Sequence, residues 1–293
     1  MRSIRKIYLK NAAGDLYGLN GERGAYATGL AGLGFTLTPT YADLKRGFFV
    51  PVSDEAEPQS ALAFTAVFTT NPYAAYEAFV SWLSSAGTIT VVYNPTGAQE
   101  YCRDVTINFV QKGEKNAVGW LEAPCSFFCN TPWYRPFPTS LSLEAAGTDE
   151  SKRYDYEYTD SLIYGADSSA GLYGTISGAG HVPGALELAY RGAIANPKIR
   201  LTGDVSGKTY GICSVAAVFS ATDSLKLSTR YENSYIMKVS ADGVETDLLD
   251  VLDLSTTPFF HIPVDEPCTL SIEADAPFSG VAELLIFYYY RSV

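Results

Sequence analysis

One amphipathic helix is predicted in a chain that otherwise has the pattern of β-strands. Residues 71–86 begin with Asn71 at a capping position and Pro72 at the first helical position, where a missing N–H costs nothing. Gly87 follows where the helix is expected to end. Apolar residues recur at intervals of three and four and therefore share one face, which consists of Tyr73, Tyr76, Phe79, Val80 and Leu83.

Strand-like runs flank this helix, at 62–69 and at 88–93. A single amphipathic helix between strands buries its apolar face by packing on the sheet that those strands form. We therefore expect the first half of the chain to be built around a helix–sheet core. Its members on the helix are Tyr73, Tyr76, Phe79 and Leu83.

The second half of the chain shows no convincing helix. Its short apolar runs alternate with turn signals, and Asp242-Gly243 is a strong signal for a tight hairpin. Strands at such short spacing indicate a sandwich or barrel. The predicted fold class is therefore mainly β, with one helix packed on an N-terminal sheet and a β-sandwich after it.

A domain boundary is expected near residue 139. Pro132, Pro136 and Pro138 fall within seven residues, and such a stretch cannot continue a sheet interior. We predict an N-terminal β domain with one helix at residues 1–139 and a C-terminal β-sandwich at residues 140–293.

The segment between 41 and 60 combines an apolar patch with an acidic, proline-bearing stretch. Phe48, Phe49 and Val50 form the patch, and residues 51–58 follow it. Such a segment between two strands is typical of a projecting loop or long hairpin. Apolar residues exposed at its tip predict a partner. In the alternative, Phe48 and Phe49 fold back onto the core.

Composition and motifs argue against several functions. The net charge is −11 and the pI is about 4.7, whereas a nucleic-acid binder usually carries a basic patch. The two histidines, His181 and His261, lie outside any nucleophile motif, so neither a serine triad nor an activated cysteine is predicted. Residues 29–34 are glycine-rich, but no helix follows them, so they do not form a nucleotide loop.

Metal, cofactor and membrane sites are not expected either. Five cysteines without regular spacing predict free thiols in a reducing compartment rather than a disulfide framework or a zinc site. No secretion signal is present at the start of the sequence, and no run reaches the roughly 20 apolar residues of a membrane span. We therefore expect the chain to fold in a cytoplasm.

A sugar ligand stays open as an alternative at this stage. β-Sandwiches bind sugars through aromatic and polar side chains on one face, and the second half is rich in tyrosine. The competing interpretation is that these tyrosines fill half-buried strand positions or interfaces. The candidates are Tyr154, Tyr156, Tyr158, Tyr164 and Tyr173.

The order of these features resembles the distal tail protein (Dit) family of phages with long non-contractile tails and of related prophages. The resemblance covers residues 4–137 well and the second half more loosely. Its most characteristic parts are Pro-Trp-Tyr at 132–134 and Asn196-Pro197. The segments that carry it are IYLKNAAGDLYGL, GLAGLGF, PYAAYEAFVSWLSSAG, TITVVYNPTGAQEYCRDVTI, GEKNAVGWLEAPCSFFCNTPWYR and LELAYRGAIANPKIRLTG.

The resemblance implies a structural role in the virion rather than catalysis. In this family the first domain forms a hexameric ring by embracing its neighbour, and the second is a galectin-like sandwich on the outside. The ring joins the tail tube protein to the tail-tip protein and leaves a channel for DNA in transit. We thus expect a non-enzymatic baseplate hub without cofactor, metal or membrane contact, assembled in the host cytoplasm and located at the virion tail tip.

On this expectation, residues 46–60 form the arm between subunits, with Phe48, Phe49 and Val50 as its anchors. An acidic channel wall, suggested by the net charge of −11, would repel DNA phosphates and let DNA pass. Two alternatives are kept. One is a carbohydrate-binding β-sandwich adhesin of a phage tail, and the other is a tail-associated glycan hydrolase, for which the many acidic residues offer possible carboxylate pairs.

Overall fold

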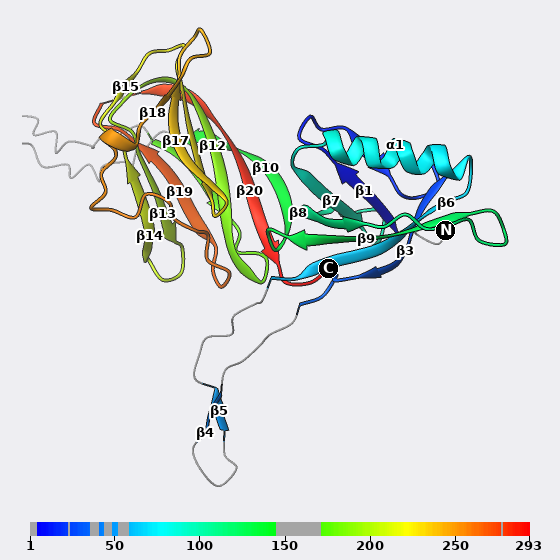
Figure 1. Cartoon of the computed structure of the whole chain (residues 1–293). Helices are drawn as coiled ribbons and strands as arrows, with labels where there is room; N and C mark the ends of the chain where they lie inside the picture. Colours follow the sequence, from blue (N-terminus) through cyan, green and yellow to red (C-terminus); the bar gives the residue numbers. More distant parts are fainter. Residues whose placement is uncertain are drawn as a thin grey trace, which may run out of the picture. The chain divides into compact units, whose positions relative to one another are not determined.

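The computed structural model describes residues 5–22, 24–35, 41–43, 49–51, 59–144, 171–276 and 278–293. The described residues are mainly β-strand with one α-helix, and the paired strands run antiparallel, which confirms the predicted fold class (Figure 1). The chain divides into two compact units. The first unit comprises residues 1–135 with 290–293, and the second unit comprises residues 136–289.

An antiparallel sheet and the helix α1 (Pro72–Ser85) make up most of the first unit. Figure 1 shows α1 lying along one face of this sheet. Tyr26 of β3 (Ala25–Ala31) also forms an isolated bridge with Asn20, which follows β2 (Leu16–Gly18). The strands, in their spatial order, are β2 (Leu16–Gly18), β1 (Lys6–Lys10), β7 (Ile89–Asn94), β8 (Tyr101–Val110), β9 (Leu121–Cys129), β6 (Ala61–Phe68) and β3 (Ala25–Ala31).

Local signals set the ends of α1. Pro72 occupies the first turn, and the amide of Ala75 donates to the Asn71 carbonyl at 2.9 Å. Asn71 stands at the capping position, but its backbone is left-handed, with φ 45°, and its side chain makes no capping hydrogen bond, contrary to our expectation. Gly87, with φ +65°, turns the chain away after Ser85.

The apolar face of α1 packs on the sheet through Phe79 and Leu83, whereas Tyr73 in the first turn of the helix is exposed. Phe79 and Leu83 are buried, and the Phe79 ring centroid lies 5.1 Å from that of Tyr17. Tyr76 is partly buried and packs edge-on against Phe68. Tyr73, which we expected in the same core, is 37% exposed. Its environment differs because the first turn faces the β8–β9 connection, as its hydrogen bond to Glu114 at 3.0 Å shows.

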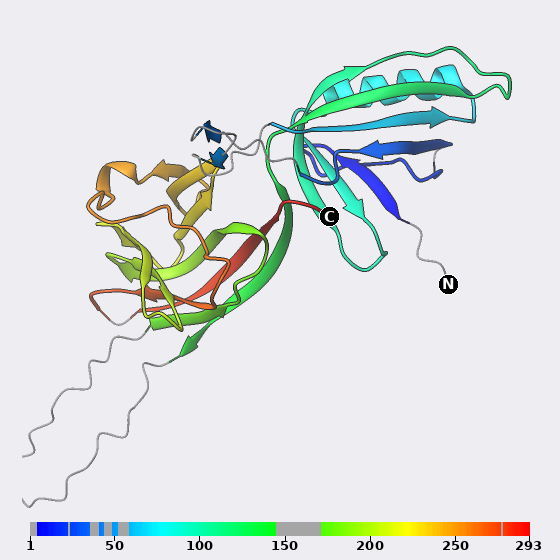
Figure 2. The ribbon, with the colours of Figure 1, turned by 90° about the horizontal axis from the view of Figure 1, so that it is seen from below.

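The second unit contains a β-sandwich. One sheet consists of β18 (Glu245–Asp247), β17 (Asn233–Val239), β16 (Ser224–Arg230), β12 (Val182–Ala195) and β20 (Ser279–Tyr290). The other consists of β14 (Thr209–Ser214), β13 (Lys198–Gly203), β19 (Cys268–Glu273) and β11 (Gly171–Ile176). β10 (Trp133–Glu144) pairs with both β11 and β20 and so belongs to both sheets (Figure 2). The short β15 (Val218–Phe219) pairs with β12, and a 3₁₀ turn spans Leu249–Val251.

Alternating residues of both sheets fill the sandwich core. Leu186, Leu188 and Tyr190 of β12 are buried, as are Leu270 and Ile272 of β19, as expected where each strand has one face inward. The hairpin predicted at Asp242-Gly243 is confirmed. Met237 pairs with Asp247 across it, and Gly243 adopts φ +79° in its turn.

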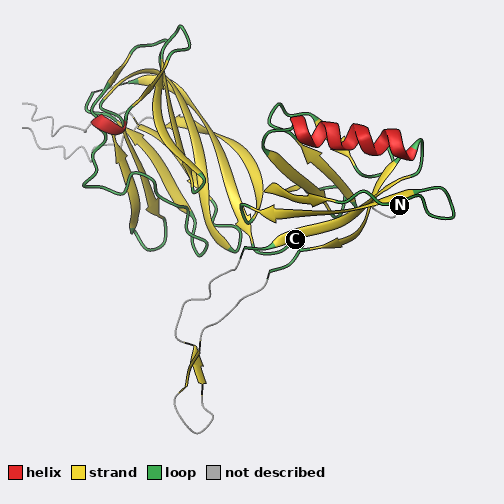
Figure 3. Ribbon diagram, viewed as in Figure 1, coloured by secondary structure: helices red, strands yellow, loops and turns green. Residues whose placement is uncertain are grey.

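A separate two-stranded sheet lies between β3 and β6 in the sequence. β4 (Tyr41–Asp43) pairs with β5 (Phe49–Pro51), with Tyr41 opposite Pro51 (Figure 3). Phe49 and Val50 of the predicted arm thus lie in β5, whereas Phe48 lies outside the described residues. A single two-stranded hairpin is at best marginally stable in water.

Candidate assembly surface

The two ends of the segment that carries β4 and β5 meet around Arg103 of β8. The Arg103 guanidinium donates through Nη1 to the Gly32 carbonyl at 3.3 Å and through Nη2 to Ser60 Oγ at 2.6 Å. Its Nε donates to the Thr131 carbonyl at 2.8 Å. Gly32 directly follows β3 and Ser60 directly precedes β6. We call Gly32–Phe35 with Gln59 and Ser60 the arm root.

Arg103 is largely buried, with 7% of its surface exposed. Its guanidinium carbon lies 5.5 Å from the ring centroid of the buried Trp133. A cavity of about 540 Å³ opens beside Arg103 and is lined by arm-root residues. We did not select Arg103 from the sequence, although a signal was present. Arg103 shares the strand phase of Val105 and Ile107, where an apolar side chain is expected.

The last residues of the sequence also contact the arm root. The Val293 amide donates to the Leu33 carbonyl at 3.3 Å. The Arg291 guanidinium carbon lies 5.8 Å from the Phe35 ring centroid. On the other side of the root, the Cys129 amide donates to the Ser60 carbonyl at 2.9 Å. Both chain ends of the arm are therefore hydrogen-bonded to neighbouring segments of the first unit.

The face of the first sheet that points away from α1 carries exposed aromatic residues. Register places them there, because Phe128 pairs with Thr106 and Phe109 pairs with Ser126, while their neighbour Phe127 points into the core. We call this surface the outer face. Its exposed aromatic residues, between 40% and 46% exposed, are Tyr26, Phe109, Trp120 and Phe128.

A hollow of about 580 Å³ lies on the outer face between β3, β6 and β9. Tyr26, Val67 and Trp120 contribute to its lining, and Glu122 is the one charged residue among the described residues that line it. Aromatic residues are enriched, and charged residues depleted, at the centres of protein–protein interfaces. This hollow of the outer face therefore has the composition of a contact surface.

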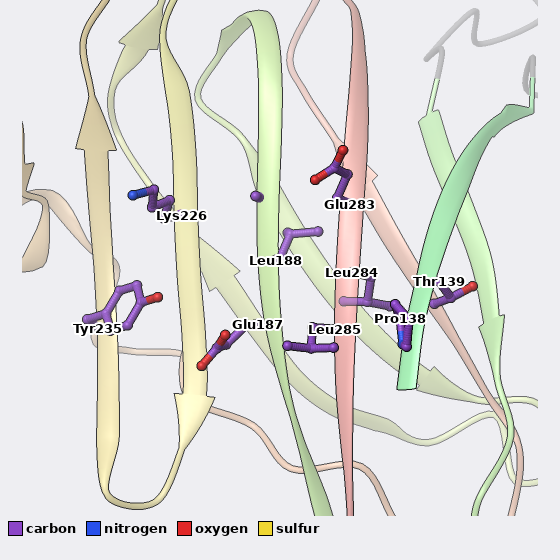
Figure 4. Close-up of a pocket in the computed structure, with 10 residues that line it drawn as sticks. Pro138, Thr139, Glu187, Leu188, Lys226, Tyr235, Glu283, Leu284 and Leu285 are labelled. Atoms are coloured by element: carbon purple, nitrogen blue, oxygen red, sulfur yellow. The ribbon is translucent and has the colours of Figure 1, made fainter. Parts of the chain in front are cut away.

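The second unit has a groove of about 620 Å³ on one sheet surface (Figure 4). Glu187 of β12 lies opposite Leu285 of β20, and both point away from the sandwich core. Two charged residues of the groove, Glu187 and Lys226, form ion pairs with residues beside it. Arg230 Nη1 lies 3.6 Å from Glu187 Oε1, and Lys226 Nζ lies 3.1 Å from Glu245 Oε1.

Tyr235 of β17 lies at one side of this groove and Thr139 of β10 at the other, with Glu283 of β20 between them (Figure 4). The pKa of Tyr235 is raised, first by burial and then by the negative charges of Glu187 and Glu245. Its hydroxyl is therefore a neutral donor at physiological pH. The predicted sugar candidates lie elsewhere or outside the described residues. Tyr173 is on β11, and Tyr154, Tyr156, Tyr158 and Tyr164 are not described.

Charge divides unequally between the two units. The first unit has 12 Lys and Arg against 11 Asp and Glu, a net charge of +1. The second unit has 9 Lys and Arg against 21 Asp and Glu, a net charge of −12. The acidity of the chain therefore belongs to the second unit.

The described residues do not form a metal site with their His, Cys, Asp and Glu side chains. No group of three or more His, Cys, Asp and Glu side chains among them is arranged to hold a metal ion. All five cysteines are free, as predicted, and burial raises the pKa of Cys125 and of Cys213 to about 12. No helix in the described part of the chain is long and apolar enough to cross a membrane.

The first part of the chain matches a known protein family. Residues 6–130 match the family model for the N-terminal domain of the distal tail protein. The chain therefore combines a domain of the phage distal tail protein class with a two-unit β fold. More particularly, residues 6–130 form a distal tail protein (Dit) N-terminal domain, the family that the order of the sequence motifs resembles.

Solved structures show the same fold along nearly the whole chain. A chain of the phage P2 baseplate, in its activated conformation with Ca, matches with a TM-score of 0.66 at 14% identity, covering 99% of this chain and 100% of that one. The SPP1 Dit (gp 19.1) protein, a hub of the adsorption apparatus in Gram-positive infecting phages, matches with a TM-score of 0.57 at 8% identity. That match covers 96% of this chain and 98% of SPP1 Dit. None of the curated proteins compared with the chain matches it.

Proposed function

We propose that six copies of this chain close into a ring that joins the tail tube protein to the tail-tip protein. The observation that carries this proposal is the distal tail protein N-terminal domain at residues 6–130. Its support is the likeness of the whole chain to baseplate and hub structures. The role is structural rather than catalytic, with the first unit forming the ring and the galectin-like second unit lying outside it.

The arm at residues 46–60 is the proposed contact between neighbouring subunits, with Phe48, Phe49 and Val50 as anchors. β4 and β5 pair only with each other among the described strands, and such a hairpin gains stability from a surface that covers it. The hollow of the outer face, which is lined by Tyr26 and Trp120 and by one charged residue, Glu122, offers such a surface on the next copy. A heterologous contact of this kind repeats around a closed ring.

The charge division changes the hypothesis about DNA passage. An acidic wall was expected from the net charge of the whole chain. The first unit, which we propose lines the channel, carries a net charge of only +1. We therefore propose that DNA passes a wall of low net charge, which neither holds the phosphates strongly nor repels them.

Replacing residues 41–56 by a Gly-Ser linker of equal length tests the ring. Ser60 and Gln59 stay in place because they belong to the arm root. The variant should remain folded, with an unchanged melting temperature, but elute as a monomer when light scattering measures its mass. A control replaces the exposed residues 12–14 between β1 and β2, which lie outside the arm root and the hollow of the outer face. A ring formed by the arm variant would refute the proposed contact.

A second candidate function is saccharide binding in the groove of the second unit. The observation that favours it is the combination of two carboxylates, Glu187 and Glu283, with the apolar surfaces of Tyr235 and Leu285. Carboxylates accept hydroxyl hydrogen bonds, and aromatic faces pack against sugar C–H groups. Binding of neutral oligosaccharides on a glycan array, lost in the E187Q/E283Q variant and kept in E245Q, would support it. Absence of binding by the wild type would refute it.

A further inference from the structure

We propose that Arg103 is a positioning residue for ring assembly, because it fixes the root from which the arm leaves the first unit. The inference rests on the proposed function, in that it takes the arm to join subunits. The arm of one subunit contacts a second copy of this chain in this proposal. What Arg103 adds is the fixed position of Gly32 and Ser60, from which the arm leaves the first unit, before that copy arrives.

Geometry is the first support. The three nitrogens of one guanidinium each donate to a different segment, namely Gly32 directly after β3, Ser60 directly before β6 and Thr131 between β9 and β10. The planar fork of arginine presents its donors in a fixed arrangement. The two chain ends of the arm are thereby held at a set position relative to β8.

The cost of burying Arg103 is the second support. Its position faces the core side of β8, where Val105 is buried and where Arg103 pairs with the fully buried Val91. Removing a guanidinium from water carries a large desolvation cost, and apolar residues of similar size often replace buried charges without loss of stability. We therefore attribute the charge at this position to its role in fixing the arm root rather than to a gain in stability.

The remaining contacts of the root show why Arg103 acts on the arm and not on the fold. Val293 and Cys129 hold the backbone of Leu33 and Ser60 by separate hydrogen bonds. Phe35, the last described residue before β4, is 48% exposed, and Gln59 is also exposed. Without Arg103, the cavity beside it admits water to the freed carbonyls. The sheet then stays intact while the arm ends gain freedom.

Loss of that order weakens assembly through entropy. An arm that is ordered before contact has less conformational freedom to lose on binding than one that is ordered only by contact. We expect R103M to raise the protein concentration at which half of the rings form by at least tenfold. Each ring contains several such contacts, so the effect accumulates around the ring.

The experiment uses the full chain in three forms, namely wild type, R103M and the control K112M, which alters an exposed cation over the Tyr73 ring in the same unit. Mass photometry across protein concentration measures ring formation. Hydrogen exchange measures the amides of 32–35 and 59–60. Tryptophan fluorescence measures the melting temperature. R103M should melt close to wild type, exchange faster at the root and assemble at least tenfold more weakly, whereas K112M should match wild type in all three.

Several outcomes would overturn the inference. Root exchange that stays at the wild-type rate in R103M shows that Arg103 does not order the arm ends. Faster root exchange with unchanged assembly shows that this order is irrelevant to the ring. If R103M does not fold, R103K replaces it, since lysine keeps the charge but lacks the fork. A wild-type chain that forms no ring refutes the proposed function, and root exchange alone then decides whether Arg103 is the positioning residue.

Discussion

The helix of the first unit allows a paired test of which residues hold it to the sheet. Phe79 and Tyr73 lie on the same predicted apolar face, but Phe79 is fully buried and Tyr73 is 37% exposed. F79A removes a ring whose centroid is 5.1 Å from that of Tyr17 and 5.6 Å from that of Phe68. Y73A removes an exposed ring and its hydrogen bond to Glu114.

Burial sets the expected magnitudes. Replacing a buried Phe by Ala costs about 3–5 kcal/mol through lost transfer free energy and the cavity left behind. At the exposed Tyr73, the substitution removes one hydrogen bond and the cation–π contact with Lys115 but leaves no cavity, so the expected loss of stability is much smaller. With about 3–4 °C per kcal/mol for a unit of this size, F79A should lower the melting temperature by about 9–20 °C and Y73A by much less.

Tryptophan fluorescence suits this measurement because all three tryptophans, Trp82, Trp120 and Trp133, lie in the first unit. Thermal melts and urea titrations of F79A, Y73A and wild type therefore follow the unit that contains the helix. The reasoning is refuted if F79A melts within about 3 °C of wild type, or if Y73A loses as much stability as F79A.

Three further predictions concern the arm root, a surface carboxylate and the cysteines. G32A should lower the free energy of unfolding by about 1–3 kcal/mol or more, since Gly32 has φ +87° and a Cβ there would lie 2.1 Å from the Ala61 carbonyl oxygen. Gly34 has open space around it, so G34A should change the free energy of unfolding, measured by urea titration, by less than about 0.5 kcal/mol. Hydrogen bonds, first from the Tyr210 hydroxyl, lower the pKa of Glu266 from 4.5 to about 2. A lowered pKa stabilises the fold above pH 4.5 and loses that contribution as the pH falls toward 2, so the urea midpoints of wild type and E266Q should differ at pH 7 and converge near pH 2; equal midpoints at pH 7 would contradict it. Cys213, with its pKa raised to about 12 by burial, should resist iodoacetamide at pH 8 until urea unfolds the chain, as mass spectrometry would show.

Several elements could be predicted from the sequence because their signals lie close together along the chain. α1 begins at Pro72 and ends before Gly87, as expected. The Asp242-Gly243 turn forms its hairpin. The family followed from the order of motifs, most of them between residues 4 and 137. In each case the deciding residues are neighbours in the sequence or recur with a fixed period.

Other features depended on contacts between distant residues. Asn71 takes a left-handed backbone and caps nothing, although its position in the sequence is that of a cap. Tyr73 shares the period of Phe79, but the surface beneath the first turn is the β8–β9 connection rather than the sheet. A period shows which residues share a face and does not show how far the opposing surface extends.

The domain division and the roles of the two domains stay predictions. Contacts divide the chain at 135 and return residues 290–293 to the first unit, whereas the sequence suggested a single change near 139. The division matters for charge. The net charge of −11 is a property of the sequence, but only the assignment of residues to units shows that the first carries +1 and the second −12.

The sequence by itself determined the β class, the single helix, the hairpin at Asp242-Gly243 and membership of a tail-protein family. Only the tertiary structure decided which part of the helix face is buried, which unit carries the net negative charge and how Arg103 holds the arm root. The physical reason is separation along the chain. Arg103 and Gly32 are 71 residues apart, and no local propensity or period connects them until the sheet brings β8 beside the end of β3.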